Sequence, residues 1–362
     1  MVKNSQKSVG VSRRFNVYEG KMKRRHINIP IFIPHLGCPN DCVFCNQRKI
    51  SGKNEFVFAS AVEELEKAFS TVDTEKSDVE IAFFGGSFTG IERGLMISLL
   101  ELAKGYIDEG KVTSIRLSTR PDYINEEILE ILKKYSVKKI ELGIQSINDN
   151  VLSVCKRGHT FSQTKDAVKA VVNHGFELVG QMMVGLPFST LADEIETAKF
   201  ICESGAVAAR IYPTVVFKGT YLETMSKNGE YIPLDSDSAV ERSAHVFEEF
   251  LKFGVPVIRV GLHSSENLSS EDEVYAGANH PALGERIMSR VYLRKIIGEI
   301  EKKQEEIKGK SITVYVAPGE TSKTVGNKGE NKKILAQEFG IKSVKIVEKA
   351  DILVYNINLE IN

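Results

Sequence analysis

The sequence predicts an α/β protein built as a partial (β/α)6 TIM-like barrel, with a small α+β domain at its C-terminal end. Three observations indicate this class. Short apolar runs alternate with segments in which apolar residues recur every three or four positions, the pattern of parallel βα units. Six such units occupy about 190 residues, whereas a complete eight-unit barrel needs about 250. The last part of the chain follows a different order of strands and helices.

Residues 1–25 form a basic N-terminal segment that precedes the first apolar run. They carry eight lysines and arginines against Glu19 alone, and they show no hydrophobic period. We expect either a solvated leader or an electrostatic arm for a polyanion.

The barrel is expected over residues 26–225. Its predicted strands are 27–34, 79–84, 114–118, 139–142, 178–183 and 207–212. Its predicted helices are 61–69, 94–109, 126–135, 162–174 and 191–204. The strands are short apolar runs, whereas the helices have one apolar face.

An extension at 226–308 and a separate domain at 309–362 are expected to follow. The predicted elements are a loop-rich stretch at 219–236, a helix at 239–253, a strand at 256–260 and a long charged helix at 282–308. In the last domain they are a strand at 312–317, a short helix, a glycine-bounded loop at 326–329, a helix at 330–339 and a strand at 344–347.

Composition excludes several classes of protein. The 362 residues balance 48 lysines and arginines against 48 acidic residues, and 42% are hydrophobic, which is typical of a globular protein and not of a disordered or collagen-like chain. No apolar run approaches the roughly 20 residues that cross a bilayer. The N-terminus lacks the apolar core of a secretory signal, so a cytoplasmic location without membrane contact is expected.

Three of the five cysteines, Cys38, Cys42 and Cys45, stand in a C-x3-C-x2-C arrangement after the first predicted strand. A disulfide framework is not expected in such a chain. Three thiolates can hold three irons of a 4Fe–4S cluster, which leaves the fourth iron open to a small molecule. Zinc is the alternative, with His35 as a fourth ligand. The isolated Cys155 and Cys202 are expected to be buried packing residues.

Further motifs follow the other predicted strands. They are FGGSFTG at 84–90, STRPDY at 118–123, ELGIQS at 141–146, KRGH at 156–159, QMMVGLP at 181–187 and RIYPT at 210–214. Together with the cysteines and the aromatic Phe44 before the last of them, this series resembles the radical S-adenosylmethionine (SAM) superfamily. It looks like the radical SAM domain of the Elongator catalytic subunit, a tRNA wobble-uridine modifying enzyme, over residues 25–225.

The resemblance implies a cofactor pair and a reaction. A 4Fe–4S cluster on the three cysteines would chelate the amino and carboxylate groups of SAM. One electron, from a reductant such as flavodoxin or ferredoxin, would cleave SAM to methionine and a 5′-deoxyadenosyl radical, which abstracts hydrogen from the substrate. The barrel would have to exclude water from this reaction.

The motif residues have expected roles beside that cofactor. Backbone near Gly85 and Gly86, or the Ser87 hydroxyl, would receive the SAM ammonium group. Glu141 would accept hydrogen bonds from ribose hydroxyls. The remaining candidates are Phe44, beside the cluster, Arg120 and Arg210 for a carboxylate or phosphate, and Gln145 and Gln181 for polar ligand groups. The alternative for each polar residue is a structural hydrogen bond at the barrel rim. Tyr212, near the barrel mouth, either has a functional role or packs in the core.

The resemblance stops before the end of the chain. The Elongator subunit carries an acetyltransferase domain, for which this chain ends too soon and shows no acetyl-CoA-like glycine signature. Its carboxymethylating chemistry is therefore not expected here. His263 and His280 stand in glycine- or proline-containing loops and either line a substrate pocket or cap helices.

The last segment looks like a minimal KH motif. In KH domains a G-x-x-G loop between two helices clamps nucleic-acid backbone. Gly326, Asn327, Lys328 and Gly329 stand in that place, with Lys323, Lys332 and Lys333 nearby. RNA binding is expected from this arrangement; the alternative is a plain surface loop.

We therefore expect a radical SAM enzyme that modifies RNA, and specifically tRNA. One alternative is a radical SAM oxidoreductase acting on a small metabolite such as a porphyrin precursor. The other is a non-catalytic iron–sulfur RNA-binding protein.

Overall fold

The computed structural model describes residues 24–33, 36, 38, 42–45, 56–262, 273–303 and 307–362. The basic segment at 1–23, His35 and His263 lie outside these residues. No helix in the described part of the chain has the length and hydrophobicity needed to cross a bilayer.

A seven-stranded parallel sheet forms the larger part of the molecule. Its strands are β1 (Arg25–Ile33), β2 (Ser77–Gly85), β3 (Ser114–Thr119), β4 (Val137–Gln145), β5 (Glu177–Val184), β6 (Ala208–Pro213) and β8 (Val257–Val260), paired in that order. The partial barrel is thus confirmed, but the prediction of six strands was one too few. The seventh strand, β8, comes from the region that we assigned to the extension, and it pairs parallel to β6.

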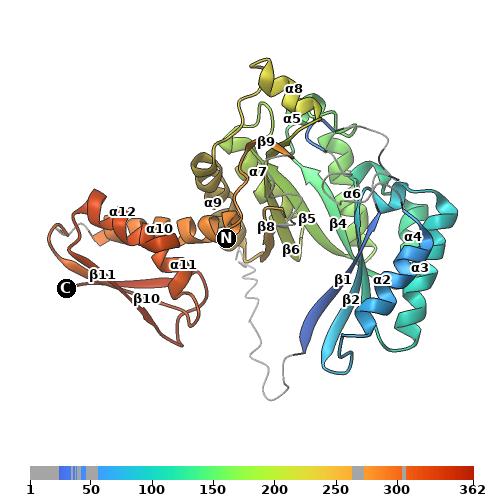
Figure 1. Ribbon diagram of the computed structural model, residues 1–362, viewed down its shortest axis with the longest axis horizontal. Coiled ribbons are helices and arrows are strands. Elements are labelled where there is room, and N and C mark those ends of the chain that lie inside the picture. Colours follow the sequence, from blue (N-terminus) through green and yellow to red (C-terminus); the bar gives the residue numbers. More distant parts are fainter. Residues whose placement is uncertain are drawn as a thin grey trace, which may run out of the picture.

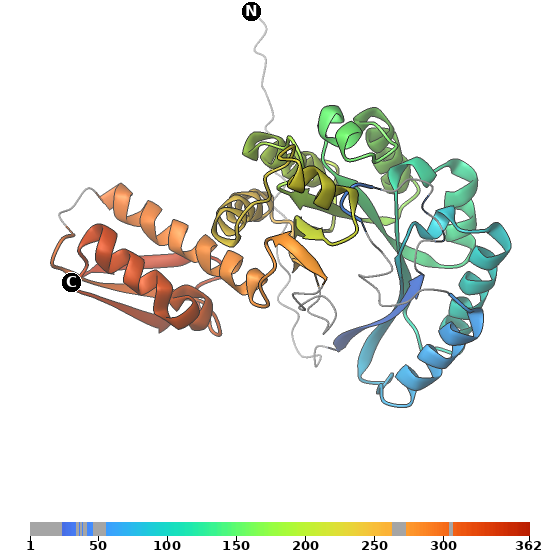
Figure 2. The same ribbon diagram turned by 45° about the horizontal axis from the view of Figure 1, so that its top comes forward.

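Helices cover the outer side of this curved sheet (Figure 1, Figure 2). They are α2 (Phe58–Phe69), α3 (Arg93–Asp108), α4 (Glu126–Lys134), α5 (Asp149–Val154), α6 (Phe161–Asn173), α7 (Leu191–Glu203) and α9 (Ser236–Phe253). Their starts follow local chemistry. Thr160 and Thr190 each cap a helix through a reciprocal capping box, and Asn125 accepts from the Ile128 amide.

The main core lies between these helices and the sheet. Each helix presents an apolar stripe, such as Leu99 and Leu100 of α3, against fully buried strand residues such as Ile81 and Ile115. The core explains why the strands read as apolar runs, since helices on one side and packed side chains on the other leave them little contact with water.

Three short elements stand over the carboxyl ends of the strands. β7 (Val215–Phe217) pairs antiparallel with β9 (Val274–Gly277), and α8 (Tyr221–Lys227) follows β7. The region 219–236, expected to be rich in loops, thus also contains the short helix α8. Its residues Leu222 and Met225 are buried against Val43 in a small separate core, a contact between distant segments that no local pattern reveals.

The C-terminal domain packs on one long helix, α10 (Leu283–Lys303). A three-stranded sheet in the order β11-β10-β12 is formed by β10 (Ser311–Val316), β11 (Ser343–Glu348) and β12 (Ile357–Ile361), and α11 (Thr321–Val325) and α12 (Glu330–Phe339) connect β10 to β11. A separate small α+β unit is thus confirmed. The last strand, β12, was not predicted; it pairs antiparallel with β10.

Candidate active site

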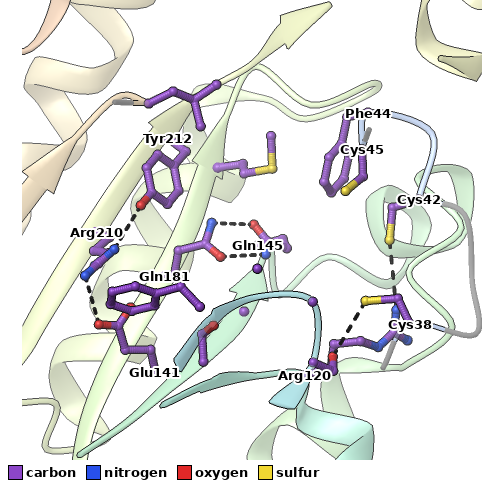
Figure 3. A pocket seen from close by; sticks show the side chains of 18 of the residues that line it. Cys38, Cys42, Phe44, Cys45, Arg120, Glu141, Gln145, Gln181, Arg210 and Tyr212 are labelled. Atoms are coloured by element: carbon purple, nitrogen blue, oxygen red, sulfur yellow. Dashed lines mark hydrogen bonds and ion pairs between the residues drawn. The ribbon is translucent and has the colours of Figure 1, made fainter. Parts of the chain in front are cut away.

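A cavity of about 640 Å³ lies on the inner side of the sheet (Figure 3). Alternate residues of several strands line it, among them Glu141 and Gln145 of β4 and Arg210 and Tyr212 of β6. Side chains two positions apart point to the same face of a strand, so this set marks the inner face of the barrel. The cavity brings together the predicted residues Cys38, Cys42, Phe44, Cys45, Gly85, Gly86, Ser87, Arg120, Glu141, Gln145, Gln181 and Arg210.

Backbone hydrogen bonds anchor the cysteine segment at Val43. The Val43 amide donates to the Cys155 carbonyl at 3.2 Å, and its own carbonyl accepts from the Leu222 amide at 2.8 Å. Val43 is 1% exposed, so both its backbone and its side chain are held. This places the flanking Cys42 and Phe44 at the wall of the cavity.

The isolated cysteines are buried in the core. Cys155 packs with Val43, and burial raises the pKa of its thiol to about 12, as expected for a packing residue. Cys202, in α7, is likewise buried with its pKa raised to about 12.

Two buried guanidinium groups lie beside Cys42. Nη1 of Arg157 is 3.2 Å from the Cys42 sulfur, and Nη1 of Arg120 is 3.9 Å from it. Cys38 Sγ is 3.9 Å from the Ser87 hydroxyl. Three thiol groups in one cavity with adjacent cations suit a thiolate-bound metal cluster, because the guanidinium groups compensate negative charge on sulfur.

Arg120 is less available to a ligand than the sequence suggested. Its Nε and Nη2 bind the two oxygens of Asp122 at 2.9 and 2.8 Å, and Nη2 also donates to the Arg157 carbonyl. Burial opposes the charge, but the hydrogen bond to Asp122 raises the pKa of Arg120. Arg120 therefore stays charged, with Nη1 directed toward Cys42.

Gly85 is required by the fold itself. Its φ is +113°, and a Cβ at this position would lie 2.5 Å from the carbonyl oxygen of Ile33 on β1. The same carbonyl accepts the Gly86 amide at 2.9 Å. The glycines thus bring the end of β2 against the end of β1, directly before the cysteine segment.

Glu141 lies within β4 and not at its end, because the strand continues to Gln145. Its Oε1 accepts from Nη1 of Arg116 and Nη2 of Arg210, each at 2.9 Å. Nε of Arg116 also binds Oε2 of Glu80 at 2.8 Å. The Glu141 carboxylate is thus held in one orientation between two arginines.

Glu80 and Arg116 were not predicted as site residues. Glu80 is fully buried and also binds Lys139 at 2.8 Å. Burial alone would raise its pKa, but Lys139 and Arg116 lower it. Each of Glu80 and Arg116 is a single charged residue within an apolar strand run. Such a residue needs a buried partner, and this feature of the sequence could have identified both.

Gln145 and Gln181 pair with each other. Each amide nitrogen donates to the other's carbonyl oxygen at 2.8 Å. Gln145 has a positive φ of 67° at the irregular end of the β4–β5 pairing. Figure 3 places this pair between the cysteines and the group of Glu141, Arg210 and Tyr212.

Two histidines of the sequence analysis can be placed. His159 of the KRGH segment is buried; burial, followed by the nearby Arg157, lowers its pKa to about 4. His280 is exposed, and its Nδ1 accepts from the Ala282 amide at 3.0 Å, a capping contact before α10.

The G-x-x-G segment lies apart from the cavity, between α11 and α12 of the C-terminal domain (Figure 1). Asn327 and Lys328 are exposed. Gly326 instead faces α10, where a Cβ would come within 3.0 Å of the Ser289 hydroxyl. The neighbouring Asn331 is buried and fixes the loop through three hydrogen bonds, two of them to Ser289. The predicted order of strand, short helix, loop, helix and strand is present in β10, α11, residues 326–329, α12 and β11.

Family comparisons match most of the chain. The family described as the radical SAM superfamily matches residues 32–201, and the Radical_SAM C-terminal domain matches residues 207–293.

The individual relatives differ in how much of their own length this chain covers. An uncharacterized protein of Methanocaldococcus jannaschii is 30% identical over 63% of this chain and 73% of its own length. The tRNA uridine(34) acetyltransferase of the same organism is 30% identical over 50% of this chain, and Elongator complex protein 3 of Saccharomyces cerevisiae is 27% identical over 51%. The chain spans only 36% of each of these two relatives.

Among solved structures, the archaeal Elp3 of Methanocaldococcus infernus with an N-terminal deletion superposes with a TM-score of 0.55. The sequence identity is 21%, and the match covers 77% of this chain and 63% of that one. At this identity the likeness establishes the fold.

Proposed function

Because the chain belongs to the radical SAM superfamily, whose members are enzymes that use a 4Fe–4S cluster and S-adenosylmethionine, we propose that it binds both groups in the cavity and modifies tRNA. The observation that carries this proposal is the convergence of Cys38, Cys42 and Cys45 with the strand-end motifs on one cavity.

Cys38, Cys42 and Cys45 would hold the cluster, which would pass one electron from an external reductant to S-adenosylmethionine and so supply reductive cleavage. The chain's residues prepare the place for this chemistry. Arg157 and Arg120 offset negative charge at Cys42, and Gly85 and Gly86 keep side chains out of the adjacent space. Glu141 offers a fixed carboxylate to ligand hydroxyl groups, whereas the paired Gln145 and Gln181 offer neutral donors and acceptors.

Support for tRNA as the substrate comes from the relatives named for tRNA uridine(34) and Elongator. We propose that the exposed Lys328 and the surrounding lysines of the G-x-x-G loop dock the RNA while the barrel performs the reaction. A cytoplasmic enzyme supplied with electrons by a flavodoxin or ferredoxin fits this function.

Mass spectrometry of tRNA nucleosides from cells with and without the protein tests the substrate. Loss of one modified nucleoside on deletion, restored by the wild-type chain and not by Cys42→Ala, is the expected result. An unchanged nucleoside profile together with turnover of a small metabolite, such as a porphyrin precursor, would refute the RNA assignment.

Docking is tested separately. Lys328→Glu reverses the charge of an exposed loop side chain, so it should reduce tRNA retention without unfolding the chain. Gln337→Glu, on the exposed part of α12, adds an acidic group away from the loop and is the surface control. Equal retention by both variants would remove the loop from the binding surface.

A further inference from the structure

The end of the cavity opposite the cysteines carries an arginine pair. Arg210 of β6 and Arg259 of β8 are register partners on neighbouring strands, and both line the cavity. Figure 3 places Arg210 and Tyr212 across the cavity from the cysteines. Nη1 of Arg210 donates to the Tyr212 hydroxyl at 3.2 Å. Two guanidinium groups and a phenol therefore gather at one end of the cavity.

The charges at this end are unbalanced. The two carboxylates of the buried network, Glu80 and Glu141, are already paired with three cations, Arg116, Arg210 and Lys139. Arg259 adds a further cation; within the described part of the chain its side chain donates to the Gly261 carbonyl at 3.2 Å and pairs with no carboxylate. Nε of Arg210 is buried and has no hydrogen-bond partner among the described residues. Adjacent cations repel each other, so this arrangement favours a bound anion.

An aromatic surface adjoins the arginines. The guanidinium carbon of Arg210 lies 5.0 Å from the ring centre of Phe84, and that ring centre is 6.2 Å from the ring centre of Phe32. Phe32 lines the cavity from β1, on the same face of the strand as Asn28 and Pro30, and is 37% exposed. A flat, partly exposed ring beside a cationic group suits a nucleotide, since bases stack on aromatic rings.

We propose that Arg210 and Arg259 bind the phosphate of a substrate nucleotide whose base packs against Phe32. The terminal nitrogens of Arg259 match the geometry of phosphate oxygens. Arg210 would donate from its unpaired Nε, and the Tyr212 hydroxyl can donate a further hydrogen bond. This subsite rests on the proposed function, because it assigns the target nucleotide of the RNA to the end of the cavity facing the cysteines. A nucleotide turned out of the RNA stack would enter the cavity with its phosphate against Arg210 of β6 and Arg259 of β8.

Calorimetric titration of the reconstituted full-length chain with uridine 5′-monophosphate and with uridine tests the subsite. The nucleotide should bind more tightly than the nucleoside. Arg259→Met should weaken nucleotide binding by about 10- to 100-fold, the usual effect of losing charge-assisted hydrogen bonds, and leave nucleoside binding unchanged. Arg259→Lys should restore part of the affinity, because lysine keeps the charge without the fork. Arg93→Met, an exposed arginine of α3, is the control that removes the same charge elsewhere.

Competition on the wild-type chain does not depend on folding of a variant. Inorganic phosphate should compete with the nucleotide and not with uridine. Equal affinities for nucleotide and nucleoside, unchanged nucleotide affinity in Arg259→Met, or competition by malonate but not by phosphate would each overturn the assignment. Binding of S-adenosylmethionine is measured in the same samples. If the wild-type chain binds the nucleotide but does not bind S-adenosylmethionine, the proposed function is refuted and the phosphate subsite is retained.

Discussion

The backbone at Gly85 leaves no space for a side chain, and this single residue connects the ends of β1 and β2. Gly85→Ala should lower the free energy of unfolding by about 2–4 kcal/mol, because a positive φ and a 2.5 Å approach to the Ile33 carbonyl are both incompatible with alanine. Gly105→Ala, at an exposed position in the last turn of α3 with no atom nearby, should be neutral or stabilise by up to about 1 kcal/mol. Urea denaturation of both variants decides; equal stabilities would contradict the role of Gly85.

His159 predicts a pH dependence of stability. Its folded pKa of about 4 lies below the ordinary 6.5, so the unfolded chain binds the proton more readily. The contribution of His159 to stability is therefore fully present above pH 6.5 and is lost as the pH drops toward 4, by up to about 3 kcal/mol. His159→Gln should flatten this part of the profile in denaturation experiments between pH 4 and 7. A variant that loses as much stability as the wild type over that range would show that His159 is not the group responsible.

Sequence reasoning at the residue scale found the residues that end the strands, because all parallel strands end at the same edge. It did not find a role for Arg157. The contact with Cys42 spans 115 positions and depends on a carbonyl contact between Cys155 and Val43, neither of which leaves a local pattern. Arg120 was expected either to bind a ligand carboxylate or phosphate or to make a structural hydrogen bond at the rim; Asp122, two positions away, binds two nitrogens of its guanidinium group.

At the scale of elements, β3 carries a charge through the middle of the sheet. Arg116 joins Glu80 of β2 to Glu141 of β4, and all three are nearly inaccessible to solvent. Each strand alone would be destabilised by such a buried charge, so the three strands depend on one another. An apolar run interrupted by one charged residue was correctly predicted as a strand, but the partner of that residue lies on another strand and was not.

Arg116→Met should therefore cost about 3–5 kcal/mol of unfolding free energy, since it leaves two buried carboxylates with fewer partners. Arg93→Met, which breaks a pair with Glu127 at the surface, should cost no more than about 1 kcal/mol. Urea denaturation at pH 7 measures both. A difference of less than 1 kcal/mol between the two variants would mean that the network contributes little.

The strand β8 shows why the predicted element boundaries did not reveal all the strands of the sheet. A strand at 256–260 was predicted, but its distance along the chain from β6, with α8 and α9 between them, suggested a separate extension. Hydrogen bonds from β6 to β8 instead widen the barrel and bring Arg259 beside Arg210. The helix α9 packs on the sheet and so places β8 beside β6 despite the long connection between them. A local hydrophobic period in the sequence does not reveal such packing.

Over the whole molecule, α10 joins the barrel to the C-terminal domain. Its first half, with Ile287 and Val291, packs in the main core, and its second half, with Ile296 and Ile300, packs in the core of the small domain. Tyr292 lies at the transition, where its hydroxyl donates to Glu320 at 2.8 Å and accepts from the Tyr355 amide at 2.9 Å. We expect the two parts to unfold together, because neither core is complete without this helix.

Tyr292→Phe should lower stability by about 1–3 kcal/mol, since it leaves the buried Glu320 and the Tyr355 amide without this partner. Tyr315→Phe removes a comparable hydroxyl–carboxylate bond at the exposed sheet face and should cost less than about 1 kcal/mol. Thermal unfolding of the two variants and the wild type provides the comparison. Two separate transitions in the wild type, or equal losses in the two variants, would contradict the connecting role of α10.

The central claim is that Cys38, Cys42 and Cys45 hold an iron–sulfur cluster at which S-adenosylmethionine is cleaved. The most direct test reconstitutes the chain anaerobically with iron and sulfide, adds S-adenosylmethionine and a reductant, and measures bound iron and released 5′-deoxyadenosine by chromatography. We predict about four irons per chain and deoxyadenosine from the wild type, and neither from Cys42→Ser, whose fold should persist. A wild-type chain that binds only zinc, or binds iron and releases no deoxyadenosine, would contradict the account.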